Sequence, residues 1–223
     1  MALVGLLHTG EMHVGNFAAL FEEILPEAAL SHLVREDLLM EAQLDGGLTP
    51  HVAQGTRESL AELAAQGASV VLCTCSTLGP AVETADAELS VPVLRIDRPL
   101  AEAAVNAGRR ILVAATAATT LGPTRAILED AARKAGREVS LEMLELEEAW
   151  PFFEAGDEEG YWKAIAEGLR DRAAGFDAVV LAQASMAGAG PLLKDLGIPV
   201  LSSPRLAVER TAALYRAATG SDG

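Results

Sequence analysis

The stretch Val70-Val71-Leu72-Cys73-Thr74-Cys75-Ser76-Thr77 has a counterpart later in the chain, Val179-Val180-Leu181-Ala182-Gln183-Ala184-Ser185-Met186. Each copy is an apolar run that ends in small polar residues, and each is followed by a hydrophobic-Pro-Val-Leu segment, at Val91–Leu94 and Ile198–Leu201. Only the first copy contains cysteine. The recurrence predicts two similar halves with a cleft between them. It also makes a thiol of the first half the best candidate for chemistry.

The spacing of the landmarks supports a duplication. Three pairs recur at a near-constant offset: Val70 and Val179 (109 positions), Pro92 and Pro199 (107), and Gly5 and Val113 (108). Any two strands of a parallel sheet look alike, but the constant offset favours a repeated unit of roughly a hundred residues, a usual domain size. We expect one half over residues 1–97 and a second over residues 98–204, with a C-terminal helix at 205–219 joined to the first half.

Short apolar runs alternate with longer stretches that are rich in Ala, Leu and Glu. Strict alternation of strand and helix indicates βαβ units, and continuous apolar strands are typical of parallel sheets covered on both faces. The predicted fold is α/β, with two similar parallel-sheet αβα halves related by a pseudo-twofold axis and an active cleft between them. Strands are expected at 3–7, 29–34, 69–73, 92–96, 110–114, 140–146, 178–182 and 199–201, and helices at 14–24, 50–66, 79–87, 99–107, 123–135, 157–174, 190–195 and 205–218.

Composition and charge exclude several classes of partner. The net charge of −15 argues against nucleic acid, because a phosphate backbone requires a basic face. No segment approaches the length of a membrane span, and the first residues lack the features of a signal peptide. The two cysteines lie two positions apart, a poor geometry for a disulfide. We expect a soluble cytoplasmic protein that binds neither membrane nor nucleic acid.

Ligands of open parallel sheets bind beyond the carboxyl ends of the strands, so the residues that follow each strand form the candidate site. Small hydroxyl residues there also serve as ordinary N-caps. Their presence after several strands of both halves favours a neutral cradle for a carboxylate, completed by backbone N–H groups of helix N-termini. The expected partner is therefore a small carboxylate substrate, bound by Thr9, Ser76, Thr77, Thr116, Thr119, Gln183 and Ser185.

Cys75 is the expected catalytic thiol. It follows the strand, and the helix after Ser76 should present its positive end to the sulfur and lower the thiol pKa. Cys73 lies within the strand, where a buried small hydrophobic role is expected. The same buried role is the alternative for Cys75.

Three segments carry a resemblance to a known family. Cys75-Ser76-Thr77 resembles the Cys-Asn-Thr step of the aspartate/glutamate/hydantoin racemase superfamily, and Ala115-Thr116-Ala117-Ala118-Thr119 resembles its Ala-Thr-x-x-Thr loop. The segment 181–186 lies where that family has a second Leu-Gly-Cys-Thr motif. The resemblance covers essentially the whole chain. It implies an enzyme without cofactor, acting on a small carboxylic or amino acid as a homodimer or larger homo-oligomer.

Members of that family include amino-acid racemases, maleate isomerase and arylmalonate decarboxylase. In the racemases two cysteines flank the substrate, and one removes the α-proton while the other delivers a proton to the opposite face. This sequence departs from that pattern, because Gln183 or Ala184, depending on the alignment, replaces the second cysteine. Neither residue transfers a proton at neutral pH. The arylmalonate decarboxylases also keep one cysteine, but in the second half.

Three alternatives follow from the missing thiol. Another group acts as the second acid, with His8 the nearest candidate by strand order. Alternatively, the reaction needs a single thiol, as in decarboxylation of a malonate-type acid or cis-trans isomerisation of a maleate-type acid. The third alternative is a non-catalytic small-acid-binding protein. The substrate, the choice among these reactions and the oligomeric state stay open.

The predicted function is that of a cofactor-independent racemase- or isomerase-like enzyme acting at an α-carbon through Cys75. No metal is expected, because His8, His13 and His32 lack the spacing and the neighbouring carboxylates of a metal site.

Overall fold

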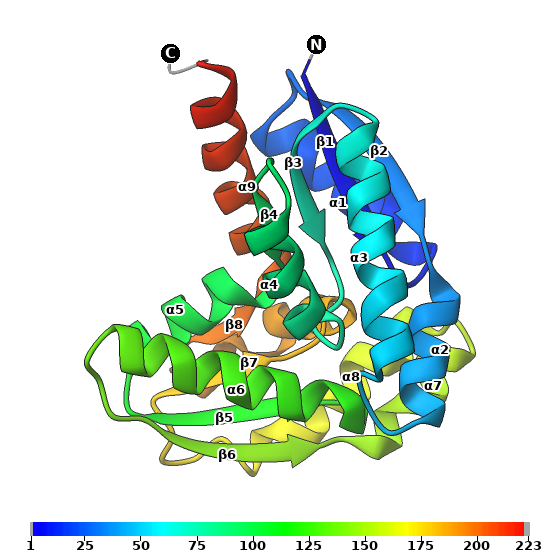
Figure 1. Ribbon diagram of the computed structural model, residues 1–223. Helices are drawn as coiled ribbons and strands as arrows, with labels where there is room; N and C mark the ends of the chain where they lie inside the picture. The colour runs from blue at the N-terminus through cyan, green and yellow to red at the C-terminus, as the bar shows by residue number, and fades with distance from the viewer. Residues whose placement is uncertain (1, 221–223) are drawn as a thin grey trace. The chain divides into compact units, whose positions relative to one another are not determined.

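The computed structural model describes residues 2–220 and divides into two compact units, Met1–Ile96 with Pro204–Gly223, and Asp97–Ser203. Each unit is built on a four-stranded parallel sheet (Figure 1). The strand order is β2-β1-β3-β4 in the first sheet and β6-β5-β7-β8 in the second. The two sheets therefore share one topology, and the predicted α/β fold with two similar halves is confirmed. The pseudo-twofold axis and the cleft stay predictions.

The first unit contains Cys75, which follows its strand β3. Its strands are β1 (Leu3–His8), β2 (Ala29–Val34), β3 (Ala68–Cys73) and β4 (Val93–Arg95). Its helices are α1 (Met12–Ile24), α2 (Glu36–Leu44), α3 (Pro50–Ala65), α4 (Gly79–Glu88) and α9 (Ser203–Thr219).

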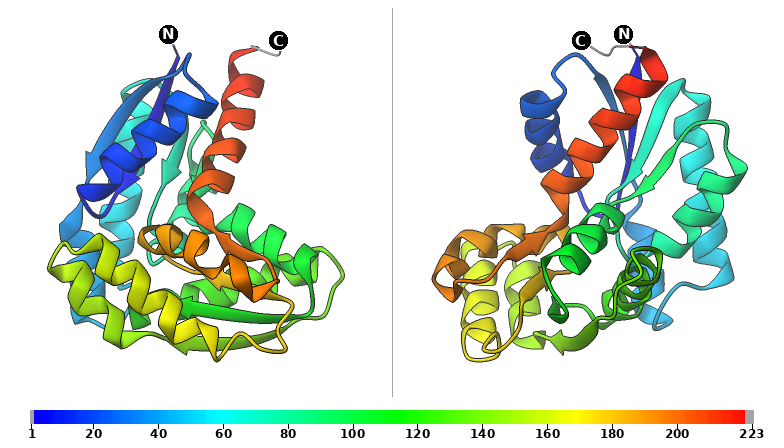
Figure 2. Two further views of the ribbon diagram at one scale, coloured as in Figure 1. Left: turned by 180° about the vertical axis from the view of Figure 1, so that it is seen from behind. Right: turned by 90° about the vertical axis from the view of Figure 1, so that its left-hand side faces the viewer.

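Helices cover both faces of the first sheet. Helices α3 and α4 lie on one face, and α1 and α9 lie on the other (Figures 1 and 2). The Tyr215 hydroxyl of α9 donates to the carbonyl of Ala2 at 3.2 Å, and Arg205 pairs with Glu23 of α1 at 2.7 Å. These contacts join the C-terminal helix to the first unit.

The second unit repeats the pattern. Its strands are β5 (Arg110–Ala115), β6 (Ser140–Glu145), β7 (Ala178–Leu181) and β8 (Val200–Ser202). Its helices are α5 (Asp97–Ala107), α6 (Ala118–Lys134), α7 (Trp150–Glu154) and α8 (Glu158–Arg170), with 3₁₀ turns η1 (Glu147–Ala149) and η2 (Ala184–Leu196). Helices α5 and α6 pack together, as do α8 and η2, on opposite faces of the sheet (Figure 2).

Local sequence explains where several elements begin. The Thr49 hydroxyl accepts from the N–H of Val52, and Pro50 occupies the first position of α3. Asp157 accepts from the N–H of Gly160 and caps α8 in the same way. Helix α6 begins at Ala118, five residues before its predicted start at Pro123, so the proline lies inside the helix. Proline is most often found in the first turn, which is why the sequence misplaced this start.

The described structure also contains elements that the sequence pattern did not predict, namely α2, α7 and η1. The expected helix at 190–195 is instead the 3₁₀ segment η2, whose glycines and Pro191 disfavour an α-helix. Across residues 2–220, no helix combines the length and apolar character needed to cross a membrane.

Candidate active site

Cys75 lies in the loop that connects β3 to α4, at the carboxyl edge of the first sheet. Its side chain is buried, with 8% of its surface exposed, and it is a free thiol. Hydroxyl groups of Thr9 and Thr77 and backbone N–H groups of Thr77 and Leu78 form hydrogen bonds with the sulfur. The loop therefore brings three of the predicted site residues, Thr9, Cys75 and Thr77, into contact.

Burial raises the pKa of the Cys75 thiol above its ordinary value. The hydrogen bonds from Thr9, Thr77 and Leu78 oppose this shift, because they stabilise the thiolate. The expectation of a lowered thiol pKa is thus wrong in its direction. Helix α4 begins at Gly79, and the amides that bond the sulfur are those of Thr77 and Leu78, which precede the helix. Their effect on the thiol pKa is smaller than the cost of removing the thiolate from water.

Cys73 ends β3, and Ser76 follows Cys75 in the loop. Cys73 is fully buried in the apolar core, and its thiol lies 3.8 Å from the carbonyl oxygen of Cys75. Ser76 is 6% exposed, and its carbonyl accepts from the N–H of Gly79. Of the two thiols, only Cys75 therefore has any solvent-accessible surface.

His8, at the end of β1, belongs to a buried hydrogen-bonded chain. The Thr74 hydroxyl donates to the carbonyl of Leu7 at 3.2 Å, so it accepts from the Nδ1–H of His8 at 2.9 Å. The Nε2 of His8 then accepts from the Nδ1–H of His32, also at 2.9 Å. Both ring nitrogens of His8 are occupied, and its side chain is fully buried.

Burial, with His32 and His13 nearby, lowers the pKa of His8 to about 3. Burial also lowers the pKa of His13 to about 4 and shifts that of His32 downward. His8 is therefore neutral at physiological pH and has no proton to spare for a substrate. The arrangement favours a structural role for His8. Within residues 2–220, no group of three His, Cys, Asp or Glu side chains is arranged to hold a metal ion.

In the second unit, Gln183 at the end of β7 fills an amide-lined position beside β5. Its side-chain oxygen accepts from the backbone N–H of Thr116 at 2.6 Å and of Ala117 at 3.2 Å. The Thr116 hydroxyl adds a third donor at 3.1 Å. Three donors on one oxygen are the arrangement that stabilises oxyanions and carboxylates. Here a neutral amide oxygen of the chain itself occupies the position.

Tyr161 of α8 links the other predicted residues of this unit. Its hydroxyl lies 2.9 Å from the hydroxyl of Thr116 and 3.0 Å from that of Ser185. Trp162, the next residue, donates its indole N–H to the carbonyl of Ser185 at 2.9 Å. Burial raises the pKa of Tyr161, so the phenol is protonated and can donate. Thr116, Gln183, Ser185 and Tyr161 thus form one connected polar cluster.

Thr119, in the first turn of α6, lies apart from this network. Its hydroxyl oxygen is buried and has no hydrogen-bond partner within the described residues 2–220. The structure therefore joins two of the three predicted hydroxyls of the second unit and leaves Thr119 unconnected.

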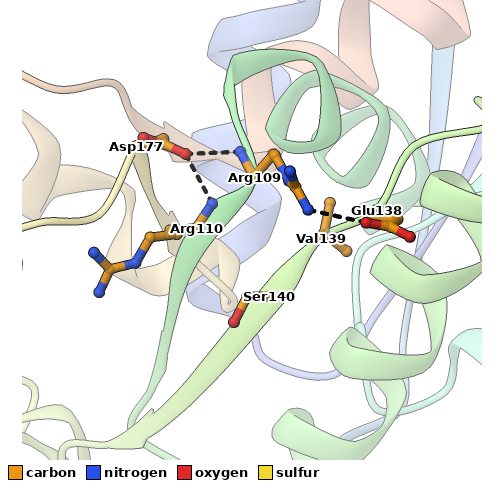
Figure 3. A pocket seen from close by; sticks show the side chains of 6 residues that line it. All are labelled: Arg109, Arg110, Glu138, Val139, Ser140 and Asp177. Atoms are coloured by element: carbon orange, nitrogen blue, oxygen red, sulfur yellow. Dashed lines mark hydrogen bonds and ion pairs between the residues drawn. The ribbon is translucent and has the colours of Figure 1, made fainter.

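A different depression lies at the amino ends of β5 and β6 (Figure 3). It has a volume of about 680 Å³, and hydrogen bonds already engage several of its polar groups. Asp177 accepts from the backbone N–H groups of Arg109 and Arg110 at 2.7 and 2.8 Å, and the Arg109 guanidinium pairs with Glu138 at 2.9 Å. Since ligands of parallel sheets bind at the opposite edge, this depression is not the candidate site.

The comparison with protein families identifies the chain. The model that describes the Asp/Glu/Hydantoin racemase family matches residues 24–211. The chain belongs to this family. The resemblance seen at the three motifs is therefore confirmed. A sequence search among curated proteins gives no significant match.

Solved structures of the family share the fold at low sequence identity. Aspartate racemase of Picrophilus torridus is 14% identical with a TM-score of 0.71, covering 98% of this chain and 95% of that one. Glutamate racemase of Thermus thermophilus in complex with beta-chloro-D-alanine is 18% identical with a TM-score of 0.66, covering 98% and 82%. A double mutant of arylmalonate decarboxylase in its liganded form is 17% identical with a TM-score of 0.55, covering 95% and 93%.

Two residues close to the candidate site residues, Tyr161 in the second unit and Arg95 in the first, were missed by the sequence analysis. Tyr161 comes from a helix on the face of the sheet, so an inspection of strand ends could not find it. Its one signal was its place, beside Trp162, in a helix that otherwise exposes acidic side chains. Arg95 ends β4 and is 4% exposed, although arginine is rarely buried. Its position at a strand end was the signal that could have drawn attention to it.

Proposed function

We propose that this protein is a cofactor-independent racemase- or isomerase-like enzyme that acts at the α-carbon of a small carboxylic or amino acid through Cys75. The observation that carries the proposal is the set of donors around the Cys75 sulfur, from Thr9, Thr77 and Leu78. A buried thiol with an apolar role needs no such donors, whereas a thiol that becomes a thiolate does.

The proposed step is a proton transfer. The Cys75 thiolate takes the α-proton, an S–H bond forms as the C–H bond breaks, and the electron pair enters an enediolate. The thiol then returns the proton to carbon. Each well-placed donor to an enediolate oxygen contributes roughly 3 kcal/mol to such a step. Hydroxyl and amide groups of Thr9, Ser76 and Thr77 are the proposed donors in the first unit.

In the second unit we propose that Thr116, Thr119, Gln183 and Ser185 take part in the same reaction as binding or shaping groups. Support comes from the connected cluster of Thr116, Gln183 and Ser185, three of these four residues. Gln183 has no ionisable proton, so it acts by hydrogen bonding. A single thiol serves one face of the α-carbon, so proton exchange should proceed with retention unless another acid contributes.

A malonate-type decarboxylase is the second candidate. The hydrogen bonds that hold the Gln183 side chain favour it, because Gln183 supplies no ionisable proton for a second proton transfer. In this reaction a C–C bond breaks, carbon dioxide leaves, and the Cys75 thiol protonates the resulting enediolate. It needs only one proton donor. In a maleate-type isomerase the Cys75 thiolate would instead add to the C=C bond, whose π electrons move into an enediolate. After rotation about the resulting C–C single bond, the C–S bond would break and the thiolate would leave. A non-catalytic acid-binding protein would form no covalent bond.

The deciding experiment follows deuterium from D₂O into candidate acids by proton NMR, with the parent protein and the Cys75→Ala and Cys75→Ser variants. Aspartate, glutamate, maleate and arylmalonate are the first substrates to test, with chiral chromatography of the products. The proposal expects exchange or turnover in the parent and a loss of at least a hundredfold in both variants, a usual size for removing a general base. Turnover that persists in the Cys75→Ala protein would exclude the thiol from the mechanism. Binding without exchange would support the binding protein.

A further inference from the structure

We propose that Arg95 is a positioning residue for Cys75, acting as a clamp on the first turn of helix α4. Arg95 ends β4, and its backbone lies opposite Cys73 in the β3–β4 register. The N–H of Ile96 continues this pairing by donating to the carbonyl of Cys73 at 3.0 Å. The main chain of Arg95 is therefore fixed to the strand from which the Cys75 loop departs.

The side chain of Arg95 reaches the other end of the same loop. A Cβ atom built on Gly79 would lie 2.4 Å from the guanidinium carbon of Arg95 and 2.7 Å from its Nε. The flat guanidinium group thus rests directly on the backbone of Gly79, the first residue of α4. Only glycine allows this approach.

One helical turn further on, the same guanidinium is held by an ion pair. Its Nη1 lies 3.1 Å from a carboxylate oxygen of Glu83, four residues after Gly79 on the same face of α4. Arg95 is 4% exposed and Glu83 is 44% exposed, so the pair is shielded on one side. The guanidinium therefore lies along the first turn of α4, in contact with the backbone of Gly79 and paired with the carboxylate of Glu83.

The position of this turn determines where the backbone donors to the Cys75 sulfur lie. The amides of Thr77 and Leu78 that bond the Cys75 thiol immediately precede Gly79. A shift of the first turn would move both donors, and hydrogen bonds weaken steeply with distance and angle. Arg95 thus holds the donors on which a Cys75 thiolate depends.

The proposal rests on the role of Cys75 proposed above, but its test reads the thiol directly and needs no substrate. The rate of alkylation by iodoacetamide is measured against pH, with peptide mass spectrometry to separate Cys75 from Cys73. The Cys75→Ala protein supplies the background. The apparent pKa of the thiol is compared for the parent, Arg95→Met, Arg95→Lys, Gly79→Ala and Glu83→Gln.

A clamp and a simple charge effect predict opposite results for Glu83→Gln. Removing a negative charge lowers a thiol pKa if only the charge matters, whereas releasing the guanidinium raises it by misaligning the donors. We expect Glu83→Gln and Gly79→Ala each to raise the pKa, with alkylation roughly three- to tenfold slower at a fixed pH below the pKa. We expect Arg95→Met to have the largest effect, and Arg95→Lys to restore part of it.

Glu88→Gln, an exposed change at the far end of α4, is the matched control and should leave the profile unchanged. If Arg95→Met does not fold, the Glu83→Gln and Gly79→Ala variants test the proposal in its place, because both retain the arginine. An unchanged or lowered thiol pKa in these two folded variants would overturn the clamp. A loss of stability alone, with the pH profile of the parent, would show that Arg95 is merely structural.

Discussion

The side-chain oxygen of Gln183 lies 2.6 Å from the backbone nitrogen of Thr116, inside a group of three donors. The resemblance to the racemases implies that Gln183 or Ala184, depending on the alignment, stands where those enzymes have their second catalytic cysteine. A thiol side chain is shorter than the glutamine side chain and accepts hydrogen bonds weakly. In this chain the Gln183 side chain is an internal acceptor, and it ties β7 to the loop that leads into α6.

Changing Gln183 to alanine should destabilise the protein by about 1–3 kcal/mol, because buried donors around Thr116 lose their acceptor. Urea unfolding measures this loss. Acetate or another small carboxylate should then raise the melting temperature of the variant more than that of the parent, since the vacated donors bind an anion.

The matched variant is Gln183→Glu, which offers a charged oxygen to the same donors. It should retain the stability of the parent at neutral pH, because hydrogen bonds to a charged acceptor are stronger. If Gln183→Glu proves as unstable as Gln183→Ala, the three donors do not hold the side chain as the structure indicates.

The fold could be predicted well from the sequence, because it depends on apolar strand segments that recur at a regular spacing along the chain. Continuous apolar runs such as Val70–Cys73 and Val179–Leu181 mark buried parallel strands, and their constant offset revealed the second sheet. Most candidate residues were then found as the residues that follow the carboxyl ends of those strands. Topology alone places Cys75 and Thr9 at one edge, and the hydrogen bond between them follows from that placement.

The parts that sequence could not predict depend on packing across elements. The thiol pKa rises because the loop is buried, and burial is a property of the folded structure. Tyr161 reaches Thr116 from a helix, and Arg95 reaches Gly79 across a loop, and neither contact has a signature in local sequence. The state of His8 was hidden for the same reason, since both its partners come from neighbouring strands or loops.

Thr9 donates its hydroxyl hydrogen to the Cys75 sulfur and so favours the thiolate. Thr9→Val preserves the shape and removes this donor, and we expect the thiol pKa to rise further above its ordinary value. Alkylation at a fixed pH below the pKa should slow roughly three- to tenfold, which corresponds to about half to one pH unit. The rate of iodoacetamide modification against pH measures the change.

Thr84→Val is the control for this experiment, because Thr84 is an exposed residue of α4 whose hydroxyl donates to the carbonyl of Pro80. It should alkylate like the parent. An identical profile for Thr9→Val and the parent would mean that the Thr9 hydroxyl does not bond the sulfur.

His8 makes the stability of the protein sensitive to acid. Its pKa is about 3 in the folded state, below the ordinary value of 6.5, so the unfolded chain binds the proton first as pH falls. The unfolding free energy should therefore decrease from about pH 6.5 downward, by roughly 1.4 kcal/mol per pH unit for this histidine. Denaturant unfolding between pH 7 and pH 5 measures the slope.

His8→Leu should reduce that slope, because it removes one titrating group while retaining an apolar side chain beside Phe17, and His13 and His32 supply the slope that remains. Thr74 keeps its bond to the carbonyl of Leu7 in this variant. A slope in His8→Leu as steep as that of the parent would assign the acid sensitivity to other groups.

Tyr161 connects Thr116 to Ser185 through one hydroxyl group, so Tyr161→Phe removes two hydrogen bonds and little volume. We expect the variant to fold, with a loss of about 1–2 kcal/mol in unfolding free energy. If this cluster serves the reaction of Cys75, turnover should fall by more than the stability loss explains, while alkylation of Cys75 stays at the parent rate. Tyr215→Phe, which removes one bond to the carbonyl of Ala2, is the matched control. Equal turnover in the two variants would confine Tyr161 to a structural role, since both lose a phenolic hydroxyl and only one loses the link between Thr116 and Ser185.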